Sequence, residues 1–157
     1  MEYKILDAQR WLVPQIEQLE LQCFSCPWNA EQISSQLKNN QHEFIAAVSD
    51  DKLLGYVGMM YVLDEGYIAN VAVSSEYRRL GIGDALIARL MEIALELKLS
   101  FVTLEVRASN TAAIELYTKH GFSPVGRRKN YYDLPKEDAI LMTNYLNRGS
   151  ELEDTCI

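Results

Sequence analysis

Apolar residues recur along this chain with two different periods, and the two periods predict its helices and strands. Near the N-terminus they recur at helical spacing, as at Ile16 and Leu19, which predicts an amphipathic helix. Pro27 interrupts that pattern, and Asn29 followed by Gln32 is typical of the capping box at the start of a helix. The chain therefore opens, after a short strand, with two helices in succession.

Beyond Asn40, β-rich apolar runs alternate with turn residues and later with helical stretches. The expected elements are strands at Tyr3–Asp7, Glu43–Ser49, Leu53–Leu63, Tyr67–Val73, Phe101–Val106, Phe122–Tyr132 and Ala139–Leu146, and helices at Gln9–Phe24, Asn29–Asn40, Gly81–Lys98 and Asn110–His120. This order predicts a single mixed α/β domain over residues 1–147. The polar, acidic segment 148–157 is expected to be a disordered tail.

The charge of the chain restricts the classes of partner. The formal net charge is −7 over 157 residues, which argues against a nucleic-acid-binding surface, because such surfaces cluster Lys and Arg against phosphates. An acidic surface attracts cationic partners or simply keeps the protein in solution, and both explanations stay open. The sequence has no apolar run long enough to span a membrane and no apolar signal core after Met1, so we expect a cytoplasmic protein.

The cysteines do not form a recognisable metal site. Cys23 and Cys26 are spaced as CxxC, but the chain has only three cysteines and lacks a second pair to complete four zinc ligands. His42 and His120 lie far away in the sequence, without ligand spacing. We therefore expect no metal, and favour small, half-buried helix residues over a redox role for the two cysteines.

The strongest chemical signal lies between the strand that ends at Val73 and the helix that begins near Gly81. The loop carries Arg78 and Arg79, and the helix begins with Gly81-Ile82-Gly83. A helix N-terminus presents free N–H groups to an anion, and glycines let a diphosphate approach the backbone. The segment is neither a Walker loop nor a dinucleotide fingerprint, and two glycines alone could serve only to pack the helix on the sheet.

Two motifs in this order resemble the GNAT superfamily of acetyl-coenzyme-A-dependent N-acetyltransferases. Arg78-x-x-Gly81-x-Gly83 is similar to its pyrophosphate motif, and the segment from Leu104 through Asn110 to Phe122 is similar to its second conserved block. The resemblance covers about Asn70 to Tyr132. It implies an α/β fold with a mixed central sheet, two splayed parallel strands and about four helices, with acetyl-CoA as cosubstrate and no metal.

The resemblance also implies which residues hold the cofactor. Main-chain groups near the end of the first splayed strand would hold the pantetheine arm. N–H groups at the start of the following helix would hold the pyrophosphate. The residues implied are Val71, Ala72, Val73, Arg79, Leu80, Gly81, Ile82, Gly83, Asp84 and Asn110.

Two side chains are candidates for proton transfer. In the family, the tyrosine that corresponds to Tyr117 faces the cofactor sulfur as general acid; otherwise Tyr117 would be a core tyrosine. Glu105 alternates with Leu104 and Val106 on the strand and so lies on the opposite face. The resemblance makes it the general base; otherwise it would be a surface residue or an ion-pair partner of Arg107 or Arg78.

Within the superfamily the chain is most like the bacterial ribosomal-protein-alanine N-acetyltransferases. Cys26-Pro27-Trp28 and the hairpin segment Arg127–Tyr132 carry this likeness. It implies acetylation of the α-amine of a protein N-terminus, with Tyr131 and Tyr132 flanking the substrate peptide; cross-strand aromatic packing is the alternative for these two. Arg127–Lys129 is expected to be a solvated charge run.

The alternative activities are those of a general N-terminal acetyltransferase, a small-molecule amine acetyltransferase acting on polyamines, amino acids or antibiotics, and a non-catalytic acetyl-CoA-binding module. The paired tyrosines of the hairpin argue against a small-molecule substrate, and the presence of both Glu105 and Tyr117 argues against a binding module.

Overall fold

A computed structural model describes residues 2–146 of the chain. This part contains four α-helices and seven strands. The strands are β1 (Lys4–Asp7), β2 (His42–Ser49), β3 (Lys52–Val62), β4 (Glu65–Val73), β5 (Phe101–Arg107), β6 (Ser123–Asp133) and β7 (Lys136–Tyr145), and the helices are α1 (Val13–Cys23), α2 (Ala30–Lys38), α3 (Ile82–Glu96) and α4 (Thr111–Lys119), with 3-10 turns η1 (Arg10–Leu12) and η2 (Ser75–Tyr77).

The strands pair in the order β1-β2-β3-β4-β5-β7-β6, and both parallel and antiparallel pairs occur. The predicted mixed α/β class is therefore confirmed. The chain divides into two compact units, the first formed by residues 2–60 and 69–90 and the second by residues 61–68 and 91–146. Each unit is described by itself below. The predicted tail at 148–157 lies outside the described residues.

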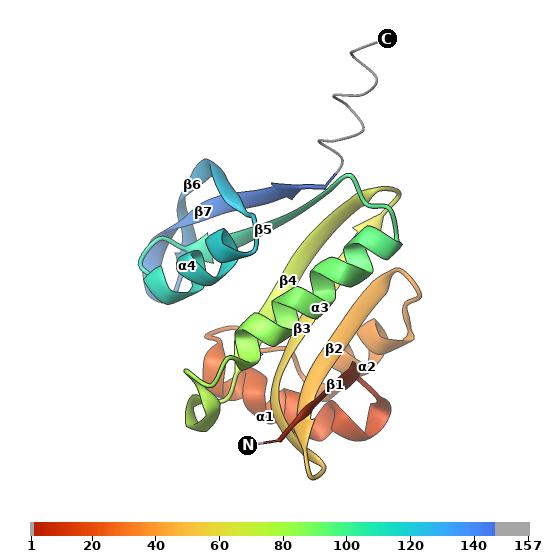
Figure 1. Ribbon diagram of the computed structural model, residues 1–157. Coiled ribbons are helices and arrows are strands. Elements are labelled where there is room, and N and C mark those ends of the chain that lie inside the picture. The colour runs from red at the N-terminus through yellow and green to blue at the C-terminus, as the bar shows by residue number, and fades with distance from the viewer. Residues whose placement is uncertain (1, 147–157) are drawn as a thin grey trace. The chain divides into compact units, whose positions relative to one another are not determined.

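In the first unit, antiparallel β1, β2 and β3 lie side by side, and Figure 1 shows α1 and α2 beside them. Apolar side chains of the two helices meet those of the strands in one cluster. Its largest fully buried members are Leu12, Ile16, Ile33 and Tyr56. Burial of apolar surface of this kind is the main favourable contribution to folding.

The start of α1 differs from the sequence prediction. A helix was expected from Gln9, but residues 10–12 form a 3-10 turn and the α-helix begins at Val13. Pro14 explains the later start, because proline lacks an N–H and is accommodated only in the first turn of a helix. The capping box of α2 is confirmed: the Asn29 side chain accepts from the Gln32 N–H, and the Gln32 side chain accepts from the Asn29 N–H.

The second unit contains β5, β7 and β6 together with α4 (Figure 1). β5 and β7 pair antiparallel along the whole of β5, and the first three residues of β5 pair in parallel with Glu65–Tyr67 of β4. Along β5, Val102, Leu104 and Val106 are buried, and the residues between them are partly exposed. The predicted alternation is therefore confirmed, and it fixes which face of the strand carries Glu105.

A buried carboxylate joins four elements of the first unit. Glu20 of α1 is 1% exposed. It accepts hydrogen bonds from the Tyr56 hydroxyl at 2.7 Å, from the Trp28 N–H at 3.0 Å and from the Asn70 side-chain amide at 3.2 Å. Burial and the neighbouring Glu20 carboxylate raise the pKa of Tyr56, so this phenol remains the donor. Glu20 thus fixes the segment between α1 and α2 to β3 and β4.

Replacement of this carboxylate should destabilise the first unit strongly. Glu20→Ala leaves three buried donors without an acceptor, and each unsatisfied buried group costs about 1–3 kcal/mol. We expect the free energy of unfolding to fall by at least about 3 kcal/mol, measured by urea denaturation. Gln18→Ala changes an exposed residue of the same helix and should stay within about 0.5 kcal/mol of wild type. Equal effects of the two variants would contradict the assigned role of Glu20.

Candidate active site

The loop before α3 contains two residues in the left-handed region of backbone conformation. Arg79 and Gly81 adopt positive φ angles of 65° and 79°, and the Ala85 N–H donates to the Gly81 carbonyl at 3.0 Å. Gly81 is therefore the N-cap of α3. In an α-helix the N–H groups of the N-cap and the next three residues have no partner within the helix. In this helix those groups belong to residues 81–84, which are among the predicted cofactor-binding residues.

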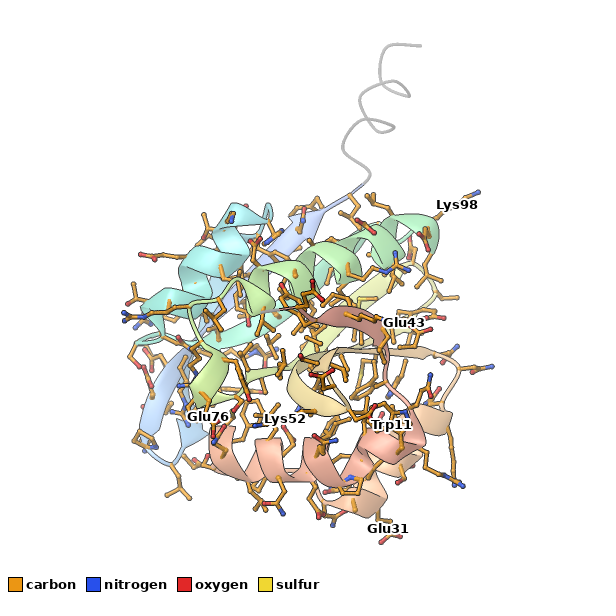
Figure 2. The ribbon with its side chains drawn as sticks, turned by 60° about the horizontal axis from the view of Figure 1, so that its bottom comes forward. Trp11, Glu31, Glu43, Lys52, Glu76 and Lys98 are labelled. Carbon is orange, nitrogen blue, oxygen red and sulfur yellow. The ribbon has the colours of Figure 1, made fainter. Side chains whose placement is uncertain are left out.

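Contacts within the first unit hold the beginning of this loop. The Ser74 N–H donates to the Leu54 carbonyl at 2.9 Å, and Arg78 Nε donates to the Val73 carbonyl at 3.3 Å. Lys52 lies 3.6 Å from a Glu76 carboxylate oxygen, and the two side chains are labelled in Figure 2. Each of these contacts is individually weak at an exposed site, but together they define the path of the chain into α3.

Neither described cysteine lies in a metal site. Cys23, at the end of α1, is half-buried, and Cys26 is exposed in the following loop. Burial raises the pKa of the Cys23 thiol, although the nearby Arg78 guanidinium, 3.9 Å from the sulfur, opposes this shift. Residues 2–146 contain no group of three or more His, Cys, Asp or Glu side chains arranged to hold a metal ion.

In the second unit, a carboxylate, an arginine and two tyrosines meet on the partly exposed face of β5. Glu105 has a side chain only 11% exposed, and Arg128 Nε lies 3.5 Å from its Oε1 atom. The Tyr67 hydroxyl donates to Glu105 Oε2 at 3.3 Å. The neighbouring Glu105 carboxylate also raises the pKa of the Tyr131 phenol. We call Tyr67, Glu105, Arg128 and Tyr131 the tyrosine–carboxylate cluster.

Tyr132 connects this cluster to the hairpin turn between β6 and β7. The rings of Tyr131 and Tyr132 meet edge to face, with centroids 5.1 Å apart. The Arg107 guanidinium stacks over Tyr132 at 4.3 Å and donates to the carbonyls of Leu134 and Pro135 at 3.1 and 2.9 Å. Burial and the Glu105 charge raise the pKa of Tyr132 to about 12, so this phenol stays neutral near pH 7.

Tyr117 and Asn110 both lie on α4. Tyr117 is 6% exposed and packs against the ring of Phe122 at 5.9 Å. Burial raises the pKa of Tyr117 to about 12, so at neutral pH this phenol is a donor and not a base. Asn110 is the N-cap of the helix, and its side-chain oxygen accepts from the Ala113 N–H at 3.2 Å.

The arrangement differs from the sequence expectations in its ion pairs. Glu105 is paired with Arg128, whereas Arg107 lies 3.3 Å from Glu137. Arg127–Lys129 are exposed, as expected for a solvated charge run, but Arg128 is paired with Glu105 and Arg127 lies 2.7 Å from Asp138. Tyr67 was not predicted as a partner of Glu105, because the parallel pairing of β4 with β5 that brings them together leaves no local sequence signal.

Comparison with known sequences defines the class of protein. The acetyltransferase (GNAT) family matches residues 13–122, and the chain belongs to this family of acetyl-CoA-dependent N-acetyltransferases. Escherichia coli (strain K12) ribosomal protein bS18-alanine N-acetyltransferase is 33% identical over 132 residues, which are 83% of this chain and 88% of the relative.

Solved structures agree with the sequence comparison. The crystal structure of the ribosomal-protein-S18-alanine N-acetyltransferase from Escherichia coli matches with a TM-score of 0.84 at 30% identity, over 92% of this chain and 94% of that one. Arabidopsis thaliana NAA60 in complex with acetyl-CoA matches with a TM-score of 0.86 at 22% identity, over 93% and 99% of the two chains, a likeness of fold. Among the described helices, none has the length and apolar character needed to cross a membrane.

The acidic residues of the hairpin should make stability depend on pH. Hydrogen bonds from Ser109 and Arg107 lower the pKa of Glu137, and those from Asn130 and Arg127 lower the pKa of Asp138. A lowered carboxyl pKa stabilises the fold above the pKa of the unfolded chain, and that stabilisation is lost as the pH falls through the folded pKa. The Tm should therefore fall as the pH drops below about 5, where the unfolded chain begins to bind protons.

Glu137→Gln should remove part of this dependence. The variant should have a lower Tm than wild type near neutral pH, and the difference should shrink in acid. Glu115→Gln on the exposed side of α4 should follow the wild-type curve. If the plots of Tm against pH for wild type and Glu137→Gln run parallel over the whole pH range, protonation of Glu137 does not contribute to the pH dependence of stability.

Proposed function

We propose that this protein transfers the acetyl group of acetyl-CoA to the α-amine of a protein N-terminus, and that its preferred substrate is the N-terminal alanine of a small-subunit ribosomal protein. The observation that carries the proposal is the shielded Glu105 carboxylate, which accepts a hydrogen bond from Tyr67 and lies beside the paired tyrosines of the hairpin. The similarity to bS18-alanine N-acetyltransferase over most of both chains supports the choice of substrate.

The chemistry of amines favours an α-amine at such a site. A free α-amine has a pKa near 7.7–8.0, whereas lysine is near 10.4. At pH 7 about a tenth of the α-amine is already neutral, but less than about a thousandth of lysine is. One carboxylate, acting directly or through a water molecule, is sufficient to remove the remaining proton from an α-ammonium group. Lysine would need roughly 3–4 kcal/mol more.

In the proposed reaction Glu105 accepts the proton of the α-ammonium group. The amine nitrogen then bonds to the thioester carbonyl carbon and loses its second proton to solvent. The carbon–sulfur bond breaks, so that coenzyme A leaves as a thiolate. Tyr117 donates a hydrogen bond to the developing thiolate. A thiol has a pKa near 8.5 and the Tyr117 phenol one of about 12. Complete proton transfer from the phenol would cost roughly 5 kcal/mol, so Tyr117 stabilises the thiolate and solvent supplies its proton.

The proposed cofactor contacts rest on the family resemblance and on the free N–H groups at the start of α3. In the proposal, the N–H groups of residues 81–84 hold the pyrophosphate, and Arg79 and Leu80 precede them in the same loop. Main-chain groups of Val71, Ala72 and Val73 receive the pantetheine arm. Because the side-chain oxygen of Asn110 already caps α4, the Asn110 amide nitrogen would make its contact with the cofactor. Tyr131 and Tyr132 flank the first residues of the peptide.

Substitutions at the two proton-transfer positions test these roles. Glu105→Gln should reduce kcat/KM for an Ala-starting peptide by about 10²- to 10⁴-fold, the usual contribution of a general base. Tyr117→Phe should reduce kcat about ten- to a hundredfold, the equivalent of one hydrogen bond to a charged group. Glu115→Gln and Tyr145→Phe are the matched controls. Thiol release is the assay; unchanged kcat in Glu105→Gln with unchanged Tm would exclude Glu105 as the base.

Substrate preference is tested with a peptide panel. Peptides that begin with Ala-Arg, Met or Ser, their N-terminally blocked forms and polyamines are each incubated with protein and acetyl-CoA. We expect turnover of the Ala-starting peptide and none of its blocked form. Equal turnover of all three free peptides would indicate a general N-terminal enzyme. Turnover of polyamines alone would replace the proposal with a small-molecule activity.

A further inference from the structure

Arg128, a cation of the chain itself, is paired with Glu105, the carboxylate that the proposed reaction needs as its base. Arg128 Nε is 3.5 Å from Glu105 Oε1, and the guanidinium is 5.8 Å from the Tyr131 ring centroid. A carboxylate together with the face of a tyrosine is a typical binding site for an ammonium group. Arg128 therefore makes the contacts that the ammonium group of a peptide N-terminus would make at the same place.

The contact of Arg128 is easily displaced. Its side chain is 56% exposed, and exposed ion pairs contribute little because water competes for both charges. The other arginines of this region are held more closely: Arg127 Nε lies 2.7 Å from Asp138 Oδ2, and Arg107 donates to two main-chain carbonyls and to Glu137. A cation that competes for Glu105 would thus move Arg128 without breaking the hairpin.

The strand that carries Arg128 is irregular at this point. The β6–β7 register shifts between Arg128 and Tyr132, and Asn130 between them has a φ of 53°. Such bulges redirect side chains and interrupt the ladder. Strand pairing is accordingly interrupted just after Arg128, although Arg128 itself pairs with Ala139.

We propose that Arg128 is a displaceable stand-in for the α-ammonium group of the substrate and thereby a specificity-determining residue. The inference rests on the proposed function. Arg128 neutralises Glu105 until a peptide with a free N-terminus replaces it, one cation exchanging for another. A neutral or blocked N-terminus cannot compete for the carboxylate and leaves Arg128 in place. Selection for a free α-amine therefore begins at binding, before any proton is transferred.

The test compares two peptides in their affinity for the full-length protein saturated with coenzyme A, measured by titration calorimetry. One peptide begins with alanine, and the other carries a propionyl group in its place, which removes only the amine. Arg128→Gln should tighten binding of the Ala-starting peptide by about two- to fivefold, the range expected for loss of a competing exposed ion pair. It should leave affinity for the propionyl peptide unchanged.

Arg127→Gln is the matched control, because it removes the same charge one residue away and should change neither affinity. Arg128→Lys keeps the competing charge and should bind both peptides as wild type does. Weaker binding of both peptides to Arg128→Gln, or an equal change for the two, would overturn the inference and make Arg128 an ordinary peptide contact or a hairpin residue. Acetylation assays on the wild type distinguish failure of the Arg128 inference from failure of the proposed function. A wild-type protein that acetylates no α-amine would overturn both the inference and the proposed function.

Discussion

The alternation of β5 is the constraint on which the chemistry of this protein depends. A strand places neighbouring side chains on opposite faces, and burial of Val102, Leu104 and Val106 leaves Glu105 on the other face. A register shift of one residue would bury the carboxylate and expose three apolar side chains. The same face carries Arg107, which holds the turn of the β6–β7 hairpin. The hydrophobic effect thus positions both the proposed base and the hairpin that shields it.

The protein uses two shielded carboxylates in opposite ways. Glu20, on α1, is 1% exposed and is surrounded by neutral donors fixed in β3, in β4 and in the segment after α1. Such a group is a structural anchor, because any movement would leave buried donors unsatisfied. Glu105 is 11% exposed and is paired with an arginine that water also reaches. Arg128 can leave Glu105 and so make room for a substrate cation, whereas the fixed donors around Glu20 cannot leave it.

Local signals predicted much of the fold and part of the candidate site. The capping box at Asn29 follows from residue type and spacing, as does the face of β5 that carries Glu105. Long-range partners had no such signal. Glu20 looks like any surface glutamate on an amphipathic helix, and Tyr67 and Arg128 lie 38 and 23 positions from Glu105 in the sequence. Their roles depend on strand pairing and register, which composition and periodicity do not determine.

One measurement tests the central claim, that the site selects a protein α-amine, most directly. A single peptide with a free N-terminal alanine and an internal lysine is incubated with the protein and acetyl-CoA near pH 7, and tandem mass spectrometry locates the acetyl group. We expect one acetyl group on the α-nitrogen and an unmodified lysine, because the α-ammonium group gives up its proton to the carboxylate more readily than the lysine ammonium group does. Acetylation of the lysine with the α-amine left free would contradict it.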